Sequence, residues 1–125
     1  MSVIGLTREN LEATVASDGI VIIDFWASWC GPCRAFKPTF EAAAEKHTDV
    51  AFYSCNTEEQ AEVAAMFQIR SIPTLVVFRD GIPVFGQPGM LPPAALDELL
   101  QKVRELDMEA VREKVAAHEA AAASA

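Results

Sequence analysis

The fold of this chain is decided by one stretch, Ile20-Val21-Ile22-Ile23-Asp24-Phe25-Trp26-Ala27-Ser28-Trp29-Cys30-Gly31-Pro32-Cys33. Its first half is an apolar run interrupted only by Asp24, and this predicts a central strand over residues 20–26 that is covered on both faces. After Cys33, apolar side chains recur at helical spacing and predict a helix over residues 33–46. Two cysteines three apart at a strand-to-helix junction indicate a redox couple.

The remaining elements alternate strand and helix at first and end with a strand pair and a helix. Further strands are expected at residues 3–4, 50–55, 74–79 and 82–86, and further helices at residues 8–16, 58–68 and 91–105. This order predicts an α/β fold with a central mixed β-sheet flanked by helices. Asp80-Gly81 indicates a hairpin between the last two strands. Pro38 is expected to kink its helix because proline removes a backbone donor.

Composition limits the possible functions. The 125 residues suit one domain, and 51% hydrophobic with 22% charged residues suits a globular chain. A net charge of −8 argues against a nucleic-acid partner. No apolar run approaches the ~18 residues of a membrane span, and no signal peptide is visible, so we expect a cytoplasmic location and no membrane contact. Three cysteines are too few for a disulfide scaffold or a structural zinc site, so no metal is expected.

The C-terminal part differs from the rest in composition. We expect one domain over residues 1–103 and a C-terminal helical extension over residues 104–125, whose end, Ala120–Ala125, is of low complexity. Asp107 is a possible N-cap, and apolar residues form a partial stripe after it. The favoured interpretation is a prolonged last helix with a frayed end. The alternatives are a second short helix docked on the domain, or a contact for a partner.

The motif Trp29-Cys30-Gly31-Pro32-Cys33 resembles that of bacterial thioredoxins, as do Asp24-Phe25-Trp26 before it and Arg70-Ser71-Ile72-Pro73-Thr74 after it. The resemblance extends from about Val3 to Leu100. It implies the thioredoxin fold and a thiol–disulfide oxidoreductase that reduces protein disulfides through a reversible Cys30–Cys33 dithiol/disulfide couple. Other segments, Asn56-Thr57-Glu58 among them, look like the branch that often carries an N-terminal zinc ribbon, which this sequence does not contain.

The resemblance also implies roles for the catalytic residues. Cys30 should be the exposed attacking thiol, and Cys33 the buried thiol that resolves the mixed disulfide. Asp24 should lie behind Cys33 and act as general acid and base. Burial within an apolar strand should raise the pKa of Asp24. The family commonly places a lysine opposite this aspartate; the matching residue here is Ser54, and the loss of that cation should raise the pKa further.

A substrate-binding surface is implied as well. Its residues should form a flat apolar platform around the couple, with a cis-proline turn: Trp29, Gly31, Pro32, Ile72, Pro73 and Gly89. Pro32 supplies neither a donor nor a positive charge where related oxidants and isomerases carry histidine, so the chain resembles a reductant. The implied partners are protein disulfide substrates and thioredoxin reductase, with no cofactor and a monomeric chain.

Two other functions are compatible with the sequence. The first is an oxidising or isomerising thioredoxin-fold protein of the periplasm, which Pro32 and the missing signal oppose. The second is a non-catalytic binding module that docks other proteins on the Trp29–Pro73 surface. Outside the motif, Cys55 is expected to be a small buried hydrophobic residue on the strand face opposite Ser54. His47 is expected only to place a cation at a helix C-terminus.

Overall fold

A single mixed sheet forms the centre of the computed structural model, which describes residues 2–124. Its strands lie in the order β1-β3-β2-β4-β5. Their bounds are Val3–Gly5 for β1, Ile20–Trp26 for β2, Val50–Asn56 for β3, Thr74–Arg79 for β4 and Ile82–Pro88 for β5. β3 runs parallel to both β1 and β2, whereas β4 is antiparallel to both β2 and β5. The predicted mixed sheet is therefore confirmed.

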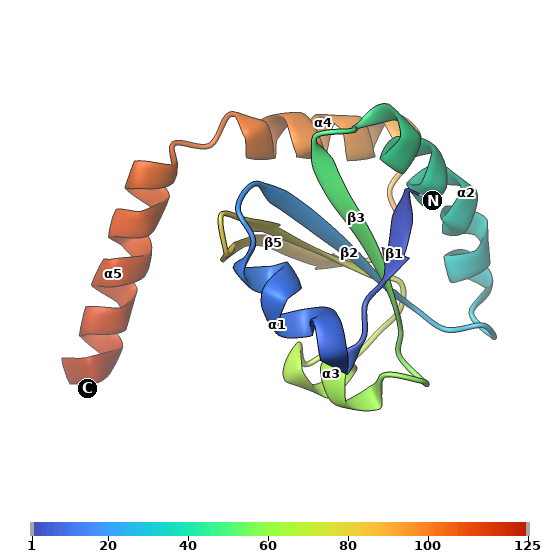
Figure 1. Cartoon of the computed structure of the whole chain (residues 1–125), viewed down its shortest axis with the longest axis horizontal. Helices are drawn as coiled ribbons and strands as arrows, with labels where there is room; N and C mark the ends of the chain where they lie inside the picture. The colour runs from blue at the N-terminus through green and yellow to red at the C-terminus, as the bar shows by residue number, and fades with distance from the viewer. Residues whose placement is uncertain (1, 125) are drawn as a thin grey trace.

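Helices cover both faces of this sheet. Their bounds are Arg8–Ala16 for α1, Gly31–Lys46 for α2, Ala61–Met66 for α3, Pro93–Arg104 for α4 and Met108–Ser124 for α5. In Figure 1, α1 and α3 lie below the sheet, whereas α2 and α4 lie above it and α5 projects away from the body. No helix in residues 2–124 is long and apolar enough to cross a membrane.

Alternation along β2 divides the core into two layers. Ile20 and Ile22 belong to the cluster that contains the buried side chains of α2 and α4. Val21, Ile23 and Phe25 belong to the cluster on the α1 and α3 side. Successive side chains of a strand point to opposite faces, so Asp24 falls on the face of Ile20 and Ile22. The same alternation that builds the core therefore places this carboxyl group under α2.

Three predicted helices differ from the observed ones at their starts, and one of them, α4, begins at Pro93 rather than Leu91. α3 begins at Ala61 rather than Glu58, because the side-chain oxygen of Asn56 accepts hydrogen bonds from the N–H groups of Glu58 and Glu59 and holds these residues in a turn. α2 begins at Gly31 instead of Cys33 and continues through Pro38 to Lys46. Helix ends are the part of an element that periodicity defines least well.

The prediction of one prolonged last helix is wrong. α4 ends at Arg104 and a separate α5 begins at Met108. The guanidinium of Arg79 donates from Nη1 to the carbonyl oxygens of Val103, Arg104 and Leu106 at 2.7, 3.1 and 3.0 Å. These bonds satisfy carbonyls that a helix end leaves without intrahelical partners. A second helix is therefore present, as in one of the two alternatives, but it is 17 residues long and projects from the domain rather than being short and docked on it (Figure 1).

The start of α5 is capped as the sequence suggested. Asp107 Oδ1 accepts hydrogen bonds from the N–H groups of Glu109 and Ala110, at 3.1 and 3.2 Å. Met108 is buried, whereas the other described side chains of α5 are half-buried or exposed. Only the first turn of α5 is thus anchored in the body.

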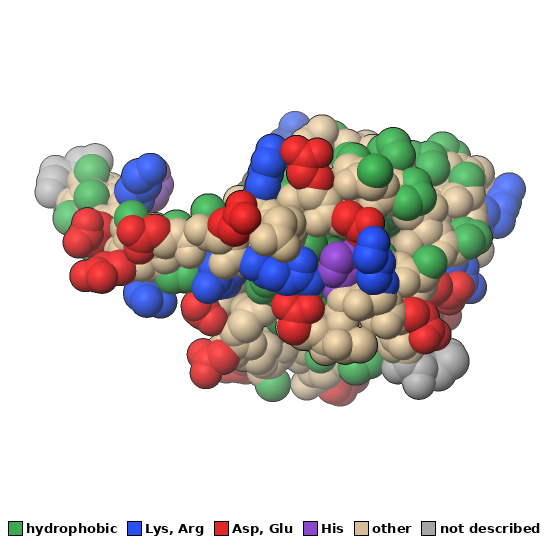
Figure 2. All heavy atoms as spheres, turned by 90° about the horizontal axis from the view of Figure 1, so that it is seen from above, with side chains coloured by type: hydrophobic (Ala, Val, Ile, Leu, Met, Phe, Trp, Pro, Cys, Tyr) green, Lys and Arg blue, Asp and Glu red, His purple; other side chains and the backbone are tan. Residues whose placement is uncertain are grey.

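A polar network joins the C-terminal end of α2 to α4. His47 is buried, and its Nε2 lies 2.7 Å from Asp97 Oδ1 while Arg104 Nη2 lies 2.8 Å from its Nδ1. Because a guanidinium only donates, Nδ1 must accept and Nε2 carries the proton. Arg104 also bonds both carboxylate oxygens of Asp49, and Lys46 pairs with Asp97. Figure 2 shows acidic and basic side chains gathered around a histidine on this face. The sequence prediction for His47 missed this network.

Candidate active site

The two cysteines of the motif meet at the N-terminus of α2. Cys30 and Cys33 form a disulfide, with their Cα atoms 5.2 Å apart. Cys30 is the N-cap of the helix, and the Cys33 N–H donates to its sulfur at 3.2 Å. Unpaired N–H groups and the positive end of the helix dipole favour negative charge at this position. In the reduced protein, the same geometry therefore stabilises a thiolate on Cys30.

The exposed fractions of the two cysteines do not differ as expected. Cys30 is 4% exposed and Cys33 is 3% exposed, so the expectation of an exposed Cys30 is wrong for the disulfide form. Their surroundings do differ. Cys30 Sγ lies 3.7 Å from the carbonyl oxygen of Ile72, whereas Cys33 lines a cavity together with Asp24. The asymmetry of the couple lies in what each residue faces.

Asp24 is a carboxyl group buried in the central strand of the sheet. It is 5% exposed, and its Oδ1 has no hydrogen-bond partner among the described residues. Burial raises the pKa of Asp24 to about 7, because a low-dielectric environment disfavours the charged form. The β2–β3 register places Ser54 directly beside Asp24, as the family resemblance implied. Ser54 contributes no charge there.

The residues expected to bind substrate surround Cys30. Trp29 is 66% exposed, and Gly31, Pro32 and Gly89 are exposed as well. Ile72 is half-buried and reaches the couple through its carbonyl group.

The turn opposite the couple is held by the backbone. The Ile72–Pro73 peptide bond is cis, as the resemblance implied. Gly89 donates its N–H to the Pro73 carbonyl oxygen at 2.8 Å, and its φ of +100° is one that glycine adopts most readily. The side chain of Pro73 is buried and lies beneath this surface rather than on it.

A cavity of about 520 Å³ lies behind the couple. Asp24, Cys33 and Ser54 line it together with three charged residues of α2, namely Arg34, Lys37 and Glu41. These three residues were not among those predicted from the sequence. Helical spacing could have found two of them, because positions 37 and 41 follow Cys33 at intervals of four residues and share its helix face.

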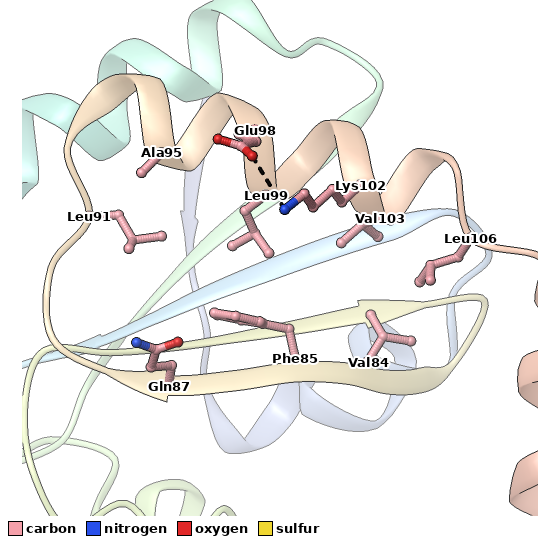
Figure 3. A pocket seen from close by; sticks show the side chains of 10 residues that line it. All are labelled: Val84, Phe85, Gln87, Leu91, Ala95, Glu98, Leu99, Lys102, Val103 and Leu106. Atoms are coloured by element: carbon pink, nitrogen blue, oxygen red, sulfur yellow. Dashed lines mark ion pairs between the residues drawn. The ribbon is translucent and has the colours of Figure 1, made fainter.

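A second groove, of about 430 Å³, lies between β5 and α4 (Figure 3). Apolar side chains such as Phe85 and Leu99 dominate it, and Glu98 pairs with Lys102 at its edge, 3.3 Å apart. Neither cysteine of the couple lines it, nor does Asp24. It is therefore separate from the redox site.

The third cysteine lies on the other side of the sheet. Cys55 is fully buried and packs in the cluster that contains Phe25. Burial raises the pKa of its thiol to about 11, so little of it is ionised near neutral pH. Its prediction as a small buried hydrophobic residue is confirmed.

Comparison with known proteins gives a consistent result. The sequence model of the family described as thioredoxin matches residues 2–104. "Putative thioredoxin 2" of Streptomyces coelicolor is 49% identical over 121 residues, which are 97% of this chain and 90% of that protein. A thioredoxin of Alicyclobacillus acidocaldarius is 41% identical over 99 residues, covering 78% of this chain and 94% of that one. A mutant thioredoxin from Halobacterium salinarum superposes with a TM-score of 0.76 at 32% identity, covering 83% of this chain and 92% of the other. The chain therefore belongs to the thioredoxin family and is a thiol–disulfide oxidoreductase, a protein-disulfide reductase whose redox-active pair is Cys30 and Cys33.

Proposed function

We propose that Cys30 is the attacking thiol of this reductase and Cys33 the resolving thiol. The Cys30 thiolate attacks one sulfur of a substrate disulfide and displaces the other as a thiolate, which leaves a mixed disulfide. Cys33 then loses its proton and attacks Cys30, which releases the second substrate sulfur. Two electrons pass to the substrate, and a Cys30–Cys33 disulfide remains. The position of Cys30 as the N-cap of α2, with the Cys33 N–H on its sulfur, is the observation that carries this assignment.

Asp24 accepts the proton of Cys33 in the resolving step. Both residues line the same cavity, and a carboxyl group with a pKa of about 7 can exchange protons near neutral pH. The cavity is large enough for water, which can carry the proton between them. A surface carboxylate with an ordinary pKa would be a weaker base for this purpose.

Substrate proteins bind as extended segments across the surface around the couple. The exposed indole of Trp29 supplies apolar contact, and the backbone of Ile72 offers hydrogen bonds to such a segment. Gly31, Pro32 and Gly89 complete the surface, with Pro73 buried beneath it, and none of them carries a charged side chain that would select against substrates. We further propose that thioredoxin reductase re-reduces the chain in the cytoplasm, that it acts as a monomer, and that nucleic acid is not a partner, which the net charge of −8 supports.

The division of roles is tested by trapping. In Cys33→Ser the mixed disulfide cannot be resolved, so the variant should accumulate covalent complexes with disulfide-containing proteins, whereas Cys30→Ser should not. Alkylation of the reduced protein gives a second measurement, because the thiolate of Cys30 should react at lower pH than Cys33. Faster modification of Cys33 would reverse the assignment. Equal activity of a Cys30→Ser, Cys33→Ser double variant would instead favour a binding module.

A further inference from the structure

The cavity behind the couple contains an unsatisfied acceptor. Asp24 Oδ1 is buried and has no hydrogen-bond partner in the described part of the chain. The neutral lining comes from β1, β2 and β3, from Ser28 in the loop after β2, and from Cys33 and Phe40 of α2. On β4, the neighbour of Asp24 in the register is the apolar Leu75. All the charged groups that line the cavity besides Asp24 itself come from α2: Arg34, Lys37 and Glu41. Any cation that faces Asp24 within this cavity must therefore come from this helix.

The two cations are not equivalent. Arg34 donates from Nη1 to the carbonyl oxygen of Ser28 at 2.8 Å, so its guanidinium is already held at the N-terminal end of α2. The side chain of Lys37 makes no hydrogen bond or ion pair with another described residue, and it is exposed. Lys37 also lies one helical turn after Cys33, on the same face of α2. Its flexible four-carbon stem can direct the ammonium either to solvent or into the cavity.

We propose that Lys37 is a positioning residue whose ammonium turns into the cavity and faces the Asp24 carboxylate when the proton of Cys33 is transferred. This proposal rests on the proposed role of Asp24 as proton acceptor. A buried carboxylate is costly without a partner, and a nearby ammonium lowers that cost. Glu41, one turn further along, opposes the effect because it brings negative charge to the same cavity. Lys37 is thus the mobile cation of the site.

The test measures the titration of the Asp24 carboxyl group by NMR in the oxidised protein. Lys37→Met should raise the pKa of Asp24 by about 0.5–1 unit, because an opposite charge near a carboxyl group lowers its pKa. Lys37→Arg should keep the parent value, and Glu41→Gln should lower it. Lys114→Met is the matched control, since it removes a lysine from α5, which has no residue in the cavity lining. A packing defect alone would not raise the pKa of Asp24 in Lys37→Met and lower it in Glu41→Gln.

The second readout is the pH profile of disulfide reduction. In Lys37→Met, the midpoint of the pH dependence of the rate should move to higher pH by the same amount as the titration. Below the midpoint the rate should therefore fall by about 3–10-fold. Ser54→Lys added to Lys37→Met should restore the parent profile, because it returns a cation to the cavity. The proposal is overturned if Lys37→Met shifts Asp24 no more than Lys114→Met does. If the titration moves but the rate follows it in no variant, the role of Asp24 in the reaction fails, whereas the pairing of Lys37 with Asp24 stands.

Discussion

Asp24, the proposed proton acceptor, carries a cost to stability. Its pKa is raised to about 7 by burial, and its Oδ1 has no partner within the described residues. In the unfolded chain an aspartate titrates near ~3.9. Ionisation is therefore harder in the folded state, so the free energy of unfolding falls as pH rises from about 4 to about 7 and stays low above that range. Below the unfolded pKa the penalty is absent.

Asp24→Asn should separate the two effects. At pH 8 the variant should be more stable than the parent by on the order of 4 kcal/mol, because each pKa unit corresponds to about 1.36 kcal/mol, and at pH 3.5 the two should be close. Disulfide exchange should slow, since the proton acceptor is lost. Urea unfolding at several pH values measures the first effect. Asp18→Asn, at an exposed position, is the control. A stability gain independent of pH would contradict the buried-carboxylate explanation.

The sequence predicted the Cys30–Cys33 pair and the buried position of Asp24 better than the polar contacts elsewhere in the fold. Cys30, Cys33 and Asp24 could be found because spacing and an interrupted apolar strand make them visible in a linear pattern. The His47 network could not be found, because Asp97 and Arg104 lie about 50 residues away in the chain and meet His47 only after α4 packs beside α2. Contacts across such distances carry no periodic signal.

At the scale of elements, periodicity predicted well which helices and strands are present, but predicted their first and last residues poorly. The bounds of α1, β2 and β4 agree with the expectation, and strong local signals mark several of them: α1 ends and β2 begins at the turn around Gly19, and β4 ends at the hairpin around Gly81. The end of α4 was misplaced, because one continuous helix was expected where the structure has α4 and α5. There the decisive contact comes from Arg79 on β4, which no pattern within residues 91–125 contains.

Arg79→Met tests whether this contact ends α4. The variant keeps most of the aliphatic stem and loses three hydrogen bonds to the carbonyl oxygens at the end of the helix. We expect the free energy of unfolding to fall by about 1.5–3 kcal/mol, the range for hydrogen bonds to a charged group. Arg8→Met is the matched control: it removes only an exposed ion pair with Glu62 and should cost less than about 1 kcal/mol. Equal losses in both variants would mean that the cap contributes no more than a surface pair.

At the scale of the whole molecule, the redox couple and the C-terminal helix α5 lie in different parts of the structure. The couple lies at the N-terminus of α2, whereas α5 projects from the far end of α4 (Figures 1 and 2). The family model ends at residue 104, but packing continues beyond it. Leu106 packs against the α2 and α4 cluster, and Met108 is 7% exposed. The packed body therefore extends a few residues beyond the expected boundary at residue 103.

Two truncations test where the domain ends. A chain that stops after Ala110 keeps Leu106 and Met108, so it should reduce disulfides at the parent rate and lose less than about 1 kcal/mol of stability, because the rest of α5 is half-buried or exposed. A chain that stops after Glu105 loses both side chains and the Leu106 carbonyl that Arg79 binds. It should lose at least about 2 kcal/mol, since burying one such side chain contributes about 1.5–3 kcal/mol. Urea unfolding and a disulfide-reduction assay measure both properties. If the shorter chain is as stable as the longer one, the body ends at α4; if the longer one loses activity, α5 itself takes part in the reaction or in substrate binding.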